Sequence, residues 1–179
     1  MHDHELSLDT FLKSVEKRAL RMAEMATGSR DDALELVQEA MLGLVRRYSA
    51  RSSESWPPLF YRILQNQVRD WHRRQAVRRK WSHWVSGVAD EEQGHMDMIA
   101  DPGAADPARQ LLLSKAGQMF VAELRRLPLR QQQAFMLRAW EGLDVADTAK
   151  AMSCSQGSVK THYSRAVHRL REALEDYWP

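Results

Sequence analysis

The side chains best suited to chemistry lie near the end of the chain, where hydrogen-bonding groups recur along one face of a predicted helix. They are Gln156, Ser158, Lys160, Thr161, Ser164, Arg165, His168 and Arg169. Amide, hydroxyl, ammonium and guanidinium groups of this kind bond base edges in the major groove of DNA. The pattern therefore predicts a DNA-reading helix, and the alternative is an ordinary helical hairpin with a solvated outer face.

The elements before this helix have the order of a helix-turn-helix. Asp144 is placed to cap a short helix over residues 145–152, and the polar turn Ser153–Ser155 follows. The long helix that comes next has an apolar stripe of Val159, Tyr163, Ala166, Val167, Leu170 and Leu174. Two further helices are expected upstream. One starts at Asp106 and Pro107 and ends at Leu127 and Pro128, and the other runs from about Leu129 to Trp140 and stops at Gly142.

A second chemical pattern interleaves basic and aromatic side chains over residues 61–84. Asp70 is the only acid in this segment. The basic residues are Arg62, Arg69, Arg73, Arg74, Arg78, Arg79 and Lys80. Tyr61, Trp71, Trp81 and Trp84 lie among them. Cations neutralise phosphates, and aromatic rings stack on exposed bases with about 1–3 kcal/mol per base. The segment therefore suits a nucleic-acid strand that is being opened, and the alternative is a solvated helix face.

Three amphipathic helices are expected in this first part of the chain. The first runs from Leu8 to Ala26, with Ser7 placed to cap it and Gly28 to end it. The second is capped by Ser29 and has an inner face of Ala33, Leu36, Val37, Ala40, Met41, Leu44, Val45 and Tyr48. The third starts near Pro57 and Pro58 and carries the stripe Leu59, Phe60, Ile63, Leu64, Val68 and Trp71. No segment alternates with period two, so the predicted fold class is all-α.

The distribution of charge divides the 179-residue chain into three parts. Residues 1–80 and 108–179 each carry a net charge of +4, whereas residues 81–107 carry six acids, no Lys or Arg, and several Gly and Pro residues. Such breakers interrupt helices and strands. We therefore expect two small helical domains, 1–85 and 107–179, joined by an acidic flexible linker at 86–106. The alternative is that the acidic stretch, residues 81–107, packs as a third small helical element of one merged domain.

The composition also excludes several classes of protein. The chain has a single cysteine, Cys154, which excludes an intrachain disulfide and a multi-thiolate zinc site. We expect Cys154 to be a small buried hydrophobic residue, and a redox-sensing role is the alternative. His162 and His168 are six residues apart, off a shared helical face, and no glycine-rich phosphate loop is present. We expect no metal, no cofactor, no small-molecule substrate and no catalysis. The sequence also lacks a signal-peptide pattern and a long apolar run, which predicts a cytoplasmic protein.

Three blocks of the sequence resemble a known family. They are DALELVQEAMLGLVRRY at 32–48, LFYRILQNQVRDWHRR at 59–74, and LPLRQQQAFMLRAWEGLDVADTAKAMSCSQGSVKTHYSRAVHRLREAL at 127–174. In this order they resemble the regions of extracytoplasmic function (ECF, group 4) sigma factors. The resemblance implies one helical domain that holds RNA polymerase and reads and melts the minus-ten element, and a second that reads the minus-35 element.

The resemblance assigns roles to particular residues of the first domain. The polymerase-binding helix would comprise Asp32, Leu36, Val37, Gln38, Glu39 and Arg46. The resemblance implies that this helix docks on the coiled coil of the largest catalytic subunit of the polymerase. The alternative is that its outer face is simply solvated. Leu36 and Val37 fall on the apolar side of the helix, so the contact is expected mainly from Gln38, Glu39, Gly43 and Arg46.

The resemblance further implies that Tyr61 and Asn66 lie by the pocket for a flipped minus-ten base, one stacking on it and the other bonding its edge. Arg69, Arg73 and Arg74 are the companion minus-ten contacts. The sequence departs from the family just upstream, where Leu59 stands in place of the usual Trp and Trp56 lies three positions earlier. This departure leaves the minus-ten sequence open.

For the minus-35 element, the base-reading candidates are Lys160, Thr161, Ser164 and Arg165. Gln156, Ser158 and His162 are assigned to phosphates or groove edges. The implied partners are core RNA polymerase, promoter DNA and an anti-sigma factor, which can be membrane-bound. A second hypothesis is a helix-turn-helix activator that works without being a sigma subunit, and a third is an enzyme or RNA-binding protein on a helical scaffold.

Overall fold

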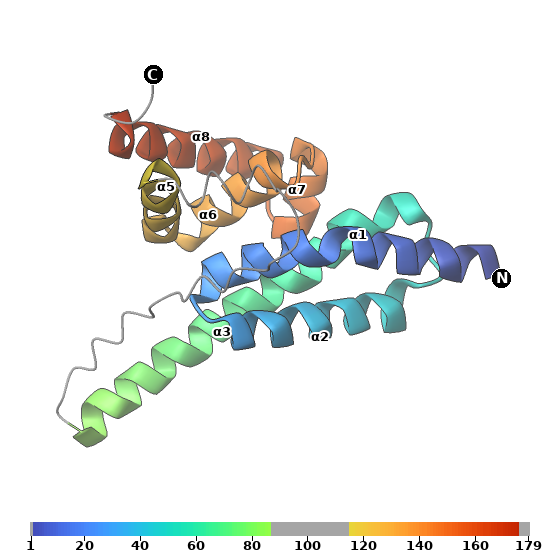
Figure 1. Cartoon of the computed structure of the whole chain (residues 1–179), viewed down its shortest axis with the longest axis horizontal. Coiled ribbons are helices and arrows are strands. Elements are labelled where there is room, and N and C mark those ends of the chain that lie inside the picture. Colours follow the sequence, from blue (N-terminus) through green and yellow to red (C-terminus); the bar gives the residue numbers. More distant parts are fainter. Residues whose placement is uncertain (1, 87–114, 176–179) are drawn as a thin grey trace. The chain divides into compact units, whose positions relative to one another are not determined.

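The computed structural model describes residues 2–86 and 115–175, and every regular element in these two ranges is helical (Figure 1). The all-α prediction is therefore confirmed. The chain divides into two compact units, Met1–Met96 and Asp97–Pro179, each with its own core. The predicted linker lies outside the described residues, apart from Ser86. Within the described ranges, no helix is long and apolar enough to cross a membrane.

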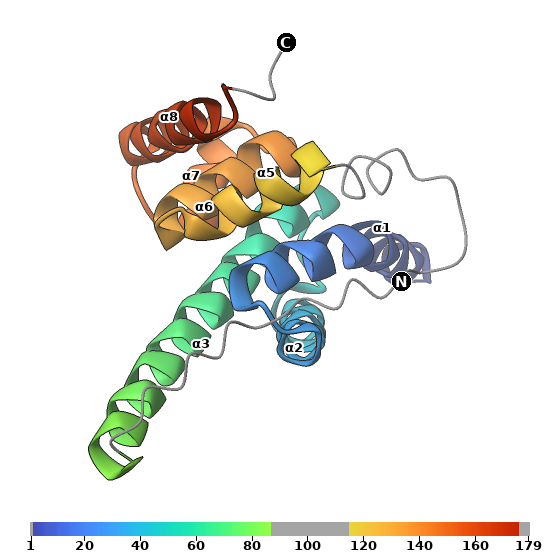
Figure 2. The ribbon, with the colours of Figure 1, turned by 60° about the vertical axis from the view of Figure 1, so that its left-hand side comes forward.

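The first unit is built from three long helices. They are α1 (His2–Thr27), α2 (Arg30–Tyr48) and α3 (Trp56–Ser86), with a 3-10 turn η1 (Ser53–Ser55) before α3. The three helices pack on one another in sequence order, and α1 also contacts α3. Figures 1 and 2 both show α3 extending past the ends of α1 and α2.

Local sequence signals fix the end of α1 and the start of α2. Gly28 ends α1 with φ +74, and its N–H donates to the Glu24 carbonyl at 2.8 Å. The Ser29 hydroxyl then accepts from the Asp32 N–H at 3.2 Å, as predicted for the cap of α2. The predicted cap at Ser7 is wrong, because α1 already begins at His2.

The core of the first unit lies where α1, α2 and α3 meet. Its fully buried large side chains are Leu44, Trp56, Phe60, Tyr61, Leu64 and Val68. The Phe11 ring of α1 lies 5.9 Å from the Trp56 ring and 6.2 Å from the Phe60 ring, measured between centroids. The predicted inner face of α2 is wrong at one position: Val45 is 39% exposed, because it lies at the edge of the apolar stripe.

The second unit contains α5 (Lys115–Arg126), α6 (Leu129–Phe135), a π-helical turn η2 (Met136–Trp140), α7 (Val145–Met152) and α8 (Gln156–Ala173). The predicted start of the first of these helices, at Asp106 and Pro107, lies outside the described residues. α8 packs on α5, α6 and α7. The core between them is formed by Leu124, Ala134, Met136, Leu137, Met152, Val159, Ala166 and Leu170.

The helix-turn-helix has the predicted boundaries. The Asp144 carboxylate accepts from the Asp147 N–H at 2.7 Å and caps α7. Ser153 adopts a left-handed conformation with φ 52, which turns the chain out of α7. The Ser155 hydroxyl then accepts from the Ser158 N–H at 3.1 Å and starts α8. The π-helical turn before Gly142 was not predicted.

Candidate nucleic-acid interface

The outer face of α8 presents a row of exposed hydrogen-bonding side chains. They are Gln156, Lys160, Thr161, Ser164, Arg165, His168 and Arg169, whereas Ser158 is half-buried at the cap. The Thr161 hydroxyl donates to the Gly157 carbonyl at 3.0 Å, so its oxygen is left to accept a hydrogen bond from a base. Within the described ranges, neither Lys160 nor Arg165 forms an ion pair, whereas His168 pairs with Glu172 at 3.3 Å. The face therefore offers the cations of Lys160 and Arg165, in the first ten residues of α8, without an ion-pair partner among the described residues.

His162 lies on the flank of α8 rather than on its outer face. Its side chain is half-buried, and its Nδ1 atom is buried without a hydrogen-bond partner in the described residues. Burial lowers the pKa of His162, and the positive charges of Arg130 and Arg165 lower it further. The lowered pKa favours the neutral imidazole, so His162 is a poor source of positive charge for the interface.

A second polar face runs along the first half of α3. Arg62, Asn66, Arg69 and Arg73 follow one another at helical spacing, on the side opposite the buried Leu64 and Val68. Arg69 donates to the Asn66 side-chain oxygen, which leaves the Asn66 amide N–H groups to donate to a base. Arg73 is exposed and pairs with Asp70 at 3.2 Å. An exposed pair of this kind is weak, so it opens readily in favour of a phosphate.

The structure does not bring the predicted aromatic partner to this face. Tyr61 is 1% exposed and packs edge-on against Phe60, with the ring centroids 5.1 Å apart. Trp56 is fully buried, and its indole N–H donates to the Tyr48 carbonyl at 3.2 Å. Neither ring can stack on a base from these positions. The stacking role inferred for Tyr61 therefore does not fit this structure, because the side chain serves the core.

Beyond its contacts with α1 and α2, α3 continues as an exposed basic arm over residues 73–81 (Figure 1). Arg73, Arg74, Arg78, Arg79 and Lys80 are all exposed there, and no acid lies among them. Val77 is 54% and Trp81 65% exposed on the same arm. The sequence predicted this concentration of cations. The side chain of Trp84 lies outside those that the structure describes.

The exposed face of α2 is chemically different. Gln38, Glu39 and Arg46 point to solvent, whereas Leu36 and Val37 are buried, as their place on the apolar stripe predicted. The Gln67 amide of α3 donates to the Glu39 carboxylate at 3.3 Å, which ties this face to α3. Asp32 is half-buried near the start of the helix.

The α2 face also carries apolar residues that the sequence did not assign to it. Among the described residues, the exposed large hydrophobics are Leu34, Leu42, Val45, Val77 and Trp81. Leu34, Leu42 and Val45 share the outer side of α2 with Gln38, because their separations of eight and three residues return to one helical face. Exposed apolar groups gathered on one face are typical of a protein-binding surface. The helical spacing of these three residues was the sequence signal that could have revealed the surface.

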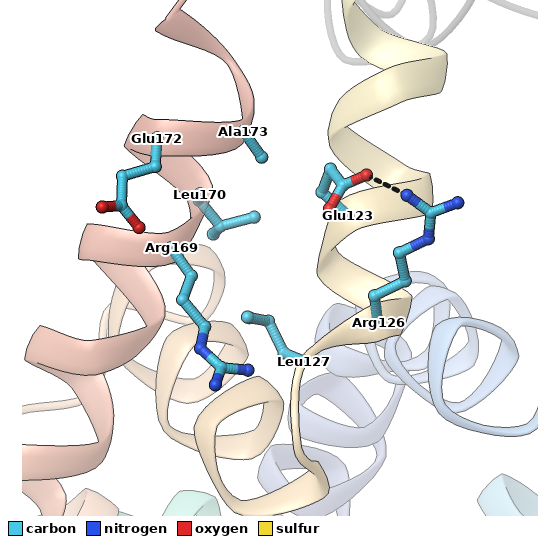
Figure 3. Close-up of a pocket in the computed structure, with 7 residues that line it drawn as sticks. All are labelled: Glu123, Arg126, Leu127, Arg169, Leu170, Glu172 and Ala173. Carbon is cyan, nitrogen blue, oxygen red and sulfur yellow. Dashed lines mark hydrogen bonds and ion pairs between the residues drawn. The ribbon is translucent and has the colours of Figure 1, made fainter.

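A shallow groove of about 400 Å³ lies between α5 and α8 (Figure 3). Its lining residues are Glu123, Arg126, Leu127, Arg169, Leu170, Glu172 and Ala173. Glu123 and Arg126 pair with each other at 2.6 Å, and the groove lies along the second half of α8, away from Lys160. The described residues contain no group of three or more His, Cys, Asp or Glu side chains that could hold a metal ion.

Comparisons with known proteins assign both units. Residues 8–78 match the family model described as Sigma-70 region 2, and residues 117–170 match the one described as Sigma-70, region 4. The ECF RNA polymerase sigma factor SigM of Mycobacterium tuberculosis is 28% identical over 94% of this chain and 77% of its own length. The chain belongs to the ECF sigma factor family. The RNA polymerase sigma-E factor of Streptomyces avermitilis is 25% identical over 97% of this sigma factor and 88% of its own length.

The fold of this ECF sigma factor also has a solved counterpart. The sigma factor RpoE of Bartonella quintana, solved in complex with the anti-sigma factor NepR, aligns with a TM-score of 0.69 at 22% identity. The alignment covers 99% of this chain and 100% of that one. The faces of α2 and α3 lie within the region 2 match, and most of α8, up to residue 170, lies within the region 4 match. Cys154 falls in the region 4 turn, where its side chain is half-buried and its N–H donates to the Ala149 carbonyl at 3.1 Å.

Proposed function

We propose that this chain binds core RNA polymerase as a sigma subunit and directs promoter-specific transcription initiation. The observation that carries the proposal is the match of regions 2 and 4, in the family order, to two separately packed helical units. Each unit presents an exposed face whose chemistry suits its assigned partner. The division into 1–85, linker 86–106 and 107–179 belongs to the same proposal.

The polymerase-binding surface is the outer face of α2. Gln38, Glu39 and Arg46 supply its polar contacts, and Leu34, Leu42 and Val45 supply apolar area. Apolar anchors surrounded by polar groups are typical of protein interfaces. We assign this face to the coiled coil of the largest catalytic subunit. Leu36 and Val37 support it from the core, and Asp32 lies at the start of the same helix.

The promoter-binding surfaces are the outer faces of α3 and α8. Asn66 and Arg69 are assigned to minus-ten bases, and Arg73 and Arg74 to phosphates. In α8, Lys160, Thr161, Ser164 and Arg165 are assigned to minus-35 base edges, and Gln156 and Ser158 to phosphates. In helix-turn-helix proteins the N-terminal part of the second helix contacts base edges in the major groove, which supports placing the base contacts within the first ten residues of α8.

We infer the remaining partners from the family. RpoE of Bartonella quintana was solved with an anti-sigma factor, and we propose that an anti-sigma factor also controls this chain. We place the action of this chain in the cytoplasm, where polymerase and promoters are found. The proposed function requires no cofactor, metal or small-molecule substrate, and it involves no catalysis by this chain itself.

The test is reconstituted transcription. Core polymerase alone, the purified chain alone, and the two together are incubated with a library of genomic fragments, and the transcript start sites are mapped. We expect specific starts only when the two are combined. A footprint by the chain alone, with no specific transcript from the mixture, would favour the helix-turn-helix activator instead.

A further inference from the structure

Arg130, in the first turn of α6, makes contacts that reach across the helix-turn-helix. Its Nη1 atom donates to the Met152 carbonyl at 3.0 Å and to the Gln133 side-chain oxygen at 3.2 Å. Met152 is the last residue of α7 and lies 22 positions further along the chain. The side chain therefore ties the end of α7 to α6.

The Met152 carbonyl is a group that needs such a donor. The last carbonyls of a helix have no partner within the helix. The N–H groups of Ser153 and Cys154 serve the carbonyls of Lys150 and Ala149, at 3.3 and 3.1 Å. The guanidinium of Arg130 serves the Met152 carbonyl, and a positive charge at a helix C-terminus is favourable.

This contact lies at the pivot between α7 and α8. Directly after Met152, Ser153 takes its left-handed conformation, and Ser155 caps α8 two residues later. The Arg130 charge also acts on His162 in the second turn of α8, together with Arg165. One side chain of α6 thus bonds the last residue of α7, next to the turn, and its charge acts on the flank of α8.

We propose that Arg130 is a positioning residue for minus-35 recognition: it fixes the turn at 153–155, and so sets the direction in which α8 presents Lys160 and Arg165. The inference rests on the proposed function. Arg130 is half-buried and both of its bonds are internal, so its role differs from that of a phosphate contact. The unit also has an apolar core around Leu124, Leu137 and Val159, so we expect it to fold without the Arg130 side chain.

The experiment compares holoenzymes that carry single substitutions in the full chain. Wild-type holoenzyme first selects its preferred minus-35 sequence from a randomised library. The affinity for that sequence is then divided by the affinity for a scrambled one, to give a selectivity ratio. We expect Arg130→Met to lower this ratio about tenfold, the change produced by about 1.4 kcal/mol. Arg130→Lys, which keeps the charge but not the guanidinium fork, is expected to lower it about threefold and provides a second variant if Arg130→Met folds poorly.

Two controls separate positioning from simple loss of charge or stability. Arg126→Met removes an exposed arginine of α5 whose ion pair, among the described residues, is with Glu123 three positions earlier. Val121→Ala destabilises the same unit from a buried position in α5, and thermal unfolding of each variant measures the loss. Both controls are expected to keep the selectivity ratio within about twofold of wild type, because neither touches the turn.

Three results would overturn the inference. The ratio could stay unchanged in both Arg130 variants, or it could fall equally in Val121→Ala. Alternatively, Arg130→Met could weaken binding to all sequences alike and reduce the salt dependence by about one unit, which is the mark of a phosphate contact. A wild-type holoenzyme without any minus-35 preference would contradict the proposed function itself, and the inference with it.

Discussion

Leu42 and Leu44 lie two residues apart on α2 and face opposite environments. Leu42 is 51% exposed on the proposed polymerase-binding face, and Leu44 is fully buried against the other helices. Leu44→Ala is expected to cost about 3–5 kcal/mol of unfolding free energy, because it leaves a cavity. Leu42→Ala should change that free energy by less than about 0.5 kcal/mol. Complete burial of a leucine is worth about 1.5–3 kcal/mol, so docking over its exposed half contributes about 1 kcal/mol.

This difference predicts about a fivefold rise in the Kd for core polymerase in Leu42→Ala, with an unchanged Tm. The Kd is measured by titrating the labelled chain with core enzyme, and the Tm by circular dichroism. Leu44→Ala provides the contrast, since its main effect is a Tm lower by roughly 10 °C or more. An unchanged Kd in Leu42→Ala, or a Tm loss as large as that of Leu44→Ala, would refute the assignment of this face.

Three further predictions concern specificity, pH and capping. In holoenzyme selections, Arg165→Ala should relax one minus-35 position by about 1–3 kcal/mol, whereas Arg73→Ala should weaken all promoters alike and lower the salt slope by about one unit; an unchanged sequence profile in Arg165→Ala would reject this division. Burial lowers the pKa of His72; the hydrogen bond to the Ala26 backbone raises it, and the charge of Arg79 lowers it again. The net shift is downward, so the unfolded chain binds a proton at His72 more readily than the folded chain does. The free energy of unfolding should therefore fall as pH drops below about 6.5. Urea titrations at several pH values should show a weaker pH dependence of this free energy in His72→Gln than in wild type, and an equal dependence in both would contradict the prediction. Asp144→Ala removes the α7 cap and should cost about 0.5–2 kcal/mol in thermal unfolding, whereas no loss would mean that the cap bond contributes nothing.

The helix boundaries that were predictable rest on local chemistry. Ser29, Asp144 and Ser155 cap the helices that the sequence indicated, because a cap bond joins residues only three positions apart. The exposed row that includes Lys160 and Arg165 was equally accessible, since helical periodicity alone separates it from the buried stripe.

The features that were missed depend on packing, or on hydrogen bonds that no regular helical spacing predicts. Tyr61 has the residue type for base stacking, yet it is 1% exposed and packs against Phe60 in the core of the first unit. The π-helical turn is held by Arg138, which donates to the Leu143 carbonyl, and by the Leu143 N–H, which donates to the Leu137 carbonyl at 3.0 Å. Arg130 was not selected either, because its partner Met152 is close only in the folded unit.

The first unit is made of helices that pack on their neighbours in the chain, with α1 on α2 and α2 on α3. Such short-range contacts allow rapid folding, and domains commonly fold during synthesis from the N-terminus. At the usual rate of translation, the second unit takes roughly ten seconds to be made after the first is complete. The nascent chain therefore carries the complete face that we propose binds polymerase before its helix-turn-helix exists. The order of synthesis gives assembly with core enzyme a head start over promoter reading.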